Sequence, residues 1–224
     1  MPGRCQNPPV TGQVEVGGRA REKAAARKND DEVVVWLRAL DPEPAPAEAP
    51  PARHQKLVQH RKTFEPHLLV VPVGSVVEFP NRDPFFHNVF SLFEGKRFDL
   101  GLYEAGVTNS VRFDREGVSF LFCNIHPEMS AVVVSVNTRY YGLTDRAGKV
   151  SIPDVPDGRY EVHYWAERAL PEALRKLTRV VTISGSTRAL GSVKIPENPD
   201  FTSLHKNKYG QDYVPPPATD YSRP

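Results

Sequence analysis

The chain reads Cys123-Asn124-Ile125-His126-Pro127-Glu128-Met129 at the end of a strand-like run, and upstream of it Asn81-Arg82-Asp83-Pro84-Phe85-Phe86-His87-Asn88-Val89. The two stretches supply one thiolate, two imidazoles and one thioether. This is the donor set of a trigonal Cys/His2 copper site with a weak axial Met. The short loop folds one histidine back toward the cysteine, and the other histidine comes from a different strand. The spacing predicts a single copper ion, as Cu(I) or Cu(II), with four metal ligands: His87, Cys123, His126 and Met129.

Two other interpretations of these residues are open. Zinc could take Glu128 instead of Met129 as its fourth ligand, but a thioether selects a soft metal and so favours copper. Without a metal, Cys123 would be a small buried hydrophobic residue, Met129 would fill the core, and His126 would be a loop residue. The upstream His87, in a strand context, favours the metal site.

The second cysteine and the other histidines carry weaker signals. Cys5 could form a disulfide with Cys123, but the motif requires a free thiolate and Cys5 lies in an irregular N-terminal segment. His60 and His67 flank Phe64, yet two histidines without a carboxylate cluster indicate surface or capping roles more than a second metal site.

Short β-branched and aromatic runs recur along the chain, separated by Gly, Pro, Asn and Asp, and helical periodicity is nearly absent. This pattern is typical of an all-β protein. We expect a Greek-key sandwich built from eight strands near residues 56–64, 68–73, 75–79, 88–93, 97–103, 108–113, 118–123 and 131–136. The only good helix candidate is 171–177, which has Pro in its first turn.

The stretch 81–136 resembles a cupredoxin, and its short ligand loop resembles those of amicyanin and of the pseudoazurin-to-plastocyanin relatives. The wider stretch, which begins before residue 81, resembles the plastocyanin-like proteins labelled methylamine-utilisation proteins. The pieces that carry the resemblance are Phe64-Glu65-Pro66-His67, Val71-Pro72-Val73-Gly74, Phe79-Pro80-Asn81, His87-Asn88-Val89, Lys96-Arg97-Phe98-Asp99-Leu100 and Cys123-Asn124-Ile125-His126. The resemblance implies a copper protein exported from a bacterium, hence periplasmic or extracellular. No signal peptide is visible, because residues 1–10 lack an apolar segment. The label itself does not establish a role in methylamine oxidation.

A second pattern begins at Tyr140 and resembles the carboxypeptidase-regulatory-like, prealbumin-type β-sandwich. It reads Thr144-Asp145-x-x-Gly148, then Pro156-x-Gly158-x-Tyr160, and Gly12-Gln13-Val14 with Val35-Trp36-Leu37 match the earlier half of that family. We therefore expect residues 11–40 and 138–196 to form one sandwich, interrupted by a copper domain at 55–137. A Pro-rich linker at 41–54 and an extended tail at 197–224 complete this division. The alternative is two consecutive units with 1–54 as a leader.

Charge and motif content narrow the function. The formal net charge of +2 is too small to indicate a nucleic-acid partner. No apolar run is long enough to span a membrane. No catalytic residues are expected, because no catalytic motif is visible and four protein ligands leave no vacant metal position. The sequence thus predicts one-electron transfer, with a cytochrome or a copper or quinone enzyme as redox partner. A copper storage, delivery or scaffold protein is the alternative.

Overall fold

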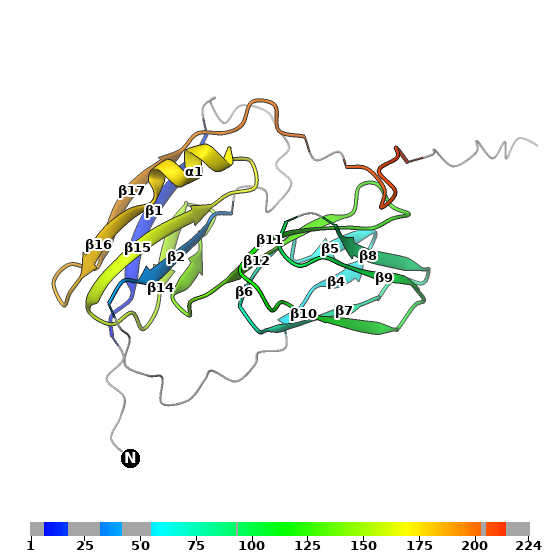
Figure 1. The fold of residues 1–224 in the computed structure, drawn as a ribbon, viewed down its shortest axis with the longest axis horizontal. Helices are drawn as coiled ribbons and strands as arrows, with labels where there is room; N and C mark the ends of the chain where they lie inside the picture. The colour runs from blue at the N-terminus through cyan, green and yellow to red at the C-terminus, as the bar shows by residue number, and fades with distance from the viewer. Residues whose placement is uncertain (1–6, 18–31, 42–54, 93, 203–204, 214–224) are drawn as a thin grey trace, which may run out of the picture.

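The computed structural model describes residues 7–17, 32–41, 55–92, 94–202 and 205–213. These residues form a nearly all-β protein, in which strands β1 to β17 accompany one short helix, α1. The predicted all-β fold class is therefore confirmed. Figure 1 shows the strands gathered into two neighbouring groups. Cys5, His54 and nearly all of the expected linker 41–54 lie outside the described residues.

The first group of strands carries the predicted metal ligands. Its sheets have the orders β6-β12-β11-β8-β9, β10-β7-β3 and β4-β5. A shared core of buried side chains, including Phe79, Phe113 and Leu121, lies between the two larger sheets, and Cys123 and Met129 belong to it. The strands are β3 (Gln55–Lys56), β4 (Val58–His60), β5 (Thr63–Glu65), β6 (Leu68–Pro72), β7 (Val76–Pro80), β8 (His87–Ser91), β9 (Phe98–Tyr103), β10 (Thr108–Arg112), β11 (Gly117–Phe122) and β12 (Ser130–Val136).

The single strand predicted over 56–64 is wrong. The structure divides this stretch into β3, β4 and the start of β5, and β4 and β5 form a hairpin in which His60 pairs with Thr63. The two turn residues, Arg61 and Lys62, have φ of 54° and 56°. Turns of this kind usually contain Asn-Gly or Asp-Gly. Arg-Lys carries no such signal, so the turn could not be recognised from its own sequence.

The second group of strands combines residues from both ends of the chain. Its sheets have the orders β14-β1-β17 and β13-β2-β15-β16. Strand β1 pairs antiparallel with β14 and parallel with β17, while β2 pairs with β13 and β15. The elements are β1 (Val10–Val16), β2 (Val34–Ala39), β13 (Tyr141–Leu143), β14 (Lys149–Ile152), β15 (Gly158–Trp165), α1 (Pro171–Leu177), β16 (Arg179–Ile183) and β17 (Ala189–Ile195). Helix α1 begins with Pro171, as the sequence indicated, and buries Leu174.

Strand β12 connects the two groups because both of its faces are buried. Ala131 and Val133 belong to the core that contains Cys123. The alternate residues Val132, Val134 and Val136 belong to a separate apolar cluster, which we call the seam. The seam also contains Leu68 and Val70 of β6 and Val34 of β2, with Trp36, Val118, Phe120, Tyr141 and Trp165 packed against it. Because side chains alternate along a strand, one strand contributes to two cores.

Candidate metal centre

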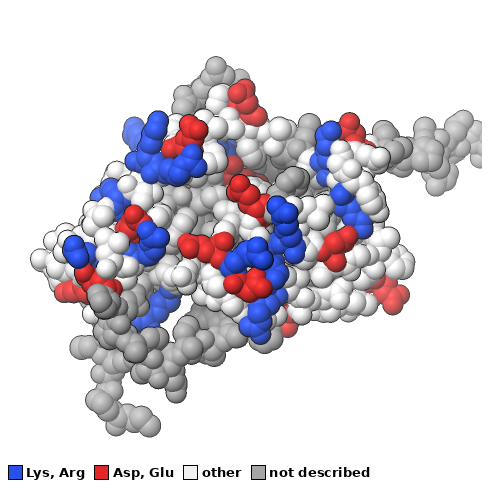
Figure 2. Space-filling view, viewed as in Figure 1, with Lys and Arg blue, Asp and Glu red and all other residues white. Residues whose placement is uncertain are grey.

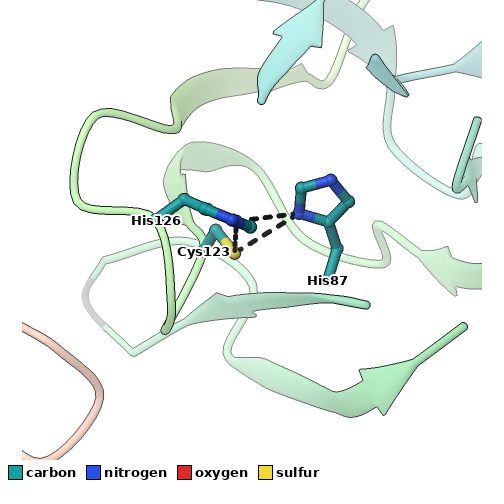
Figure 3. Close-up of side chains that lie close together, drawn as sticks. All are labelled: His87, Cys123 and His126. Carbon is teal, nitrogen blue, oxygen red and sulfur yellow. Dashed lines mark hydrogen bonds between the residues drawn. The ribbon is translucent and has the colours of Figure 1, made fainter. Parts of the chain in front are cut away.

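Three of the four predicted ligands lie together. His87 is the first residue of β8, Cys123 directly follows β11, and His126 lies in the loop before β12. Figure 3 shows the three side chains pointing toward one another. The Cys123 Sγ atom lies 3.7 Å from His87 Nδ1 and 3.5 Å from His126 Nδ1, and the two Nδ1 atoms are 3.1 Å apart. Among the described residues, these three make the group of His, Cys, Asp or Glu side chains that could hold a metal ion.

The size of this triangle fits a metal ion. The point equidistant from its three corners lies about 2.0 Å from each, and metal–nitrogen and metal–sulfur bonds in proteins are about 2.0 to 2.3 Å long. One soft thiolate and two imidazoles are the donors that a trigonal copper site uses. The three residues therefore fit a copper ion without rearrangement.

The fourth predicted ligand, Met129, is fully buried in the same core as Cys123. Its backbone N–H donates to the carbonyl of His126 at 3.1 Å, and its carbonyl accepts from the N–H of Cys123 at 3.2 Å. These two bonds close the loop from Cys123 to Met129 into a compact turn. The turn holds Cys123 and His126 in a fixed relation to each other.

Burial shapes the protonation of the group. His87 and Cys123 have no exposed surface, whereas His126 is partly exposed. Burial raises the pKa of the Cys123 thiol, although the backbone N–H groups of Asn88, Ile125 and His126 favour the thiolate. Burial, and next the neighbouring His87, lower the pKa of His126. The apo site is therefore a neutral thiol beside a neutral His126 at neutral pH.

Aromatic side chains cover the two histidines only in part. The Phe85 ring lies 5.2 Å from the His87 ring and 5.6 Å from the His126 ring, so it shields both. Phe86, the next residue in the chain, is 55% exposed. The side-chain amide of Asn88 donates to Asp99 Oδ1 and to the carbonyl of Gly101 on β9, and so connects β8 to β9.

Sequence reasoning missed Asp83, a buried carboxylate behind His87. Asp83 Oδ2 lies 2.8 Å from His87 Nε2, on the side of the ring away from Cys123. The sequence did contain a signal for this contact, because Asp83 lies four residues before His87 in the stretch 81–89. Burial raises the pKa of Asp83, but hydrogen bonds from the Lys62 N–H, from His87 and from the Arg61 N–H outweigh it and leave the pKa below its ordinary value.

Residues 205–213, within the expected extended tail, contact the end of β11 and the loop that follows it. His205 stacks on Phe122 with ring centres 4.1 Å apart. The Tyr213 hydroxyl donates to the carbonyl of Cys123 at 2.7 Å, and the Lys208 N–H donates to Asn124 Oδ1 at 3.0 Å. Residues 205–213 thus bind the loop that carries three of the predicted ligands, Cys123, His126 and Met129, a contact that no local pattern in the sequence indicated.

Among the described residues, the remaining histidines do not form a second cluster of this kind. His67 Nε2 lies 2.7 Å from Glu167 Oε2, and His67 Nδ1 lies 3.0 Å from the carbonyl of Ser130. His67 thus connects the first group of strands to the loop after β15. In the parts of the chain that the structure describes, no metal-binding group of three includes His60 or His67.

Comparison with known proteins finds similarity only among solved structures. The chain is similar to a purple cupredoxin from Nitrosopumilus maritimus (24% identity, 37% of this chain and 99% of that one, TM-score 0.34). A mutant of amicyanin in its Cu(I) form is similar as well (21% identity, 46% and 98%, TM-score 0.35).

A copper-containing nitrite reductase from Thermus scotoductus is similar over only about a quarter of its length (23% identity, 44% and 26%, TM-score 0.38). No protein-family profile matches the sequence, and no curated protein matches it. Within the described residues, no helix is long and apolar enough to cross a membrane. The donor group of His87, Cys123 and His126 by itself fits a copper ion.

Proposed function

We propose that the protein is a mononuclear blue-copper protein that transfers one electron at a time. The observation that carries the proposal is the triangle of His87 Nδ1, Cys123 Sγ and His126 Nδ1, whose size fits a metal ion. When bound, copper supplies the redox chemistry by alternating between Cu(I) and Cu(II). Met129, buried beside Cys123, is the proposed weak axial ligand.

The surrounding residues favour electron transfer over catalysis. The two backbone hydrogen bonds within the turn from Cys123 to Met129 restrict movement of the ligands. The site would therefore rearrange little when the charge of the copper ion changes. Phe85 covers both histidine rings and limits the access of water. With Met129 as the proposed fourth ligand, the site would have no vacant position for a substrate, so we propose that the protein is not an enzyme.

Electrons would enter and leave through His126, the one ligand of the triangle with exposed surface. Two exposed apolar residues are neighbours of the residues around His126. Ile125, which precedes His126 in the chain, is 42% exposed. Phe86, which is also exposed, follows Phe85, whose ring contacts the His126 ring. On the face shown in Figure 2, cationic and anionic side chains are interspersed without a large patch of one sign. We propose a redox protein, such as a cytochrome or a copper or quinone enzyme, as the partner, in the periplasm or outside the cell.

We further propose that residues 55–137 are a cupredoxin domain inserted in a host sandwich formed by 11–40 and 138–196. Support comes from the pairing of β1 with β14 and β17, and of β2 with β13 and β15. Each pairing joins a strand before the proposed insert to strands after it.

The test is titration of the purified apo protein with Cu(II), followed by absorption and EPR spectroscopy and by voltammetry. We expect one equivalent of copper, an intense thiolate-to-copper band and a reversible one-electron wave. Binding without a reversible wave would indicate the alternative, storage or delivery of copper. Preference for Zn(II) over copper, with no blue colour, would contradict the proposal.

A further inference from the structure

The buried carboxylate of Asp83 is not needed to complete the donor set, yet it lies directly behind a ligand. Only 4% of Asp83 is exposed, and His87 has no exposed surface. The two side chains meet at 2.8 Å through Asp83 Oδ2 and His87 Nε2. A buried carboxylate must be paired or well hydrogen-bonded, so its position requires an explanation.

The β4–β5 hairpin holds Asp83 as an anion. Asp83 Oδ1 accepts the backbone N–H of Arg61 at 2.6 Å, and Oδ2 accepts that of Lys62 at 2.9 Å. Both turn residues have positive φ, and successive N–H groups in such a conformation form a concave site for an anion. The backbone N–H of Asp83 itself donates to Asn81 Oδ1 at 3.0 Å, which fixes the residue from the other side.

An ionised carboxylate can only accept, so the proton between the two residues belongs to His87 Nε2. In the singly protonated ring, the Nδ1 lone pair then faces Cys123 Sγ and His126 Nδ1. Asp83 thereby selects the tautomer and the ring orientation that binding through Nδ1 requires. Carboxylate partners of metal-bound histidines also increase the basicity of the ring.

We propose that Asp83 is a positioning residue that holds His87 as an Nδ1 ligand and stabilises the oxidised site relative to the reduced one. The inference rests on the proposed function. Its electrostatic reason is that a fixed anion in a buried environment interacts more favourably with the more highly charged Cu(II) site. Removing such a partner typically changes metal affinity by about 10- to 100-fold. If the change falls mainly on the oxidised state, the reduction potential of Asp83→Asn rises by about 60 to 120 mV.

The experiment compares Asp83→Asn with a charge-matched control, Asp114→Asn. Asp114 is an exposed carboxylate that pairs with Lys96 and Arg115 and has no contact with the site residues. We expect copper-loaded Asp83→Asn to keep its blue band and to show a raised potential, whereas the control keeps the wild-type potential. An unchanged potential in Asp83→Asn, with any loss confined to thermal stability, would overturn the inference and leave Asp83 a structural tie for the hairpin.

A second measurement does not depend on the folding of the variant. In wild-type protein, nitrogen-15 NMR of the diamagnetic Cu(I) and apo forms should show His87 protonated at Nε2, with a slowly exchanging, downfield-shifted proton. A His87 protonated at Nδ1 in the apo form, or lacking the slow proton in both forms, would refute the role of Asp83. If the wild type binds no copper at all, the proposed function fails, and the NMR of the apo protein still tests the contact between the two residues.

Discussion

The raised pKa of Cys123 leads to a quantitative prediction about metal loading. Burial places this pKa above its ordinary value of 9.0, so less than about 1% of the thiol is ionised at pH 7. A metal binds the thiolate, and the proton must leave when the metal arrives. His126, whose pKa is lowered from 6.5, is already neutral at pH 7.5 and contributes almost none. We therefore expect about one proton to be released per metal ion at pH 7.5.

The same linkage fixes the pH dependence of affinity. Because one proton is displaced, the affinity falls about tenfold, or about 1.4 kcal/mol, for each unit by which the pH is lowered between 8.5 and 7. The fall becomes steeper below pH 6.5, where His126 begins to bind a proton that the metal must also displace. Neither effect needs redox chemistry, so Zn(II) serves as a redox-inert probe of the same donors.

Isothermal titration calorimetry in two buffers of different ionisation enthalpy measures the proton count directly. The control is Cys123→Ser, whose hydroxyl does not ionise in this range and should release no proton. The assignment of Cys123 as a ligand would be refuted if the wild-type protein bound metal without releasing a proton. It would also be refuted if the wild type and the Cys123→Ser variant released the same number of protons per metal ion.

Four further changes test other parts of the structure. Cys123→Ser should abolish the blue absorption band but keep the β-sheet circular dichroism, because the band arises from thiolate-to-copper charge transfer. Met129→Leu should cost less than about 1.5 kcal/mol in thermal unfolding, as a volume-conserving change, and should raise the reduction potential in voltammetry through loss of a weak axial donor. Tyr213→Phe removes a hydrogen bond of about 1 kcal/mol and should speed amide exchange in 205–213 by about fivefold. Residues 55–137, excised, should give the dispersed amide NMR spectrum of a folded copper domain.

The sequence predicted those features that depend on local spacing. The short interval between Cys123 and His126 fits only a turn, and the structure brings both side chains together with His87. The helix over 171–177 was predicted with its correct bounds, since Pro in the first turn marks its start. In each case the determining residues are neighbours in the chain, and propensity or donor chemistry is enough to identify them.

Contacts made across the chain could not be predicted in the same way. The Arg61-Lys62 turn carries no turn signature, and both of its N–H groups bind Asp83, twenty-odd residues away. The binding of the Tyr213 hydroxyl to Cys123 likewise depends on how the chain returns after β17. Such contacts are fixed by tertiary structure, and composition near either residue gives no indication of them.

The seam determines what excision of residues 55–137 can achieve. Its members Leu68, Val70, Val132, Val134 and Val136 belong to the excised piece, but Val34 and the tryptophans that cover them belong to the other group of strands. The core around Cys123 would stay complete, because all of its members lie within 55–137. The excised piece should thus fold and bind copper, yet expose a contiguous apolar face and self-associate. Polar replacement of Val132 and Val134 should restore a monomer in analytical ultracentrifugation without changing the copper spectrum, since neither side chain faces the metal ligands. A changed spectrum would mean that the two cores that share β12 are coupled.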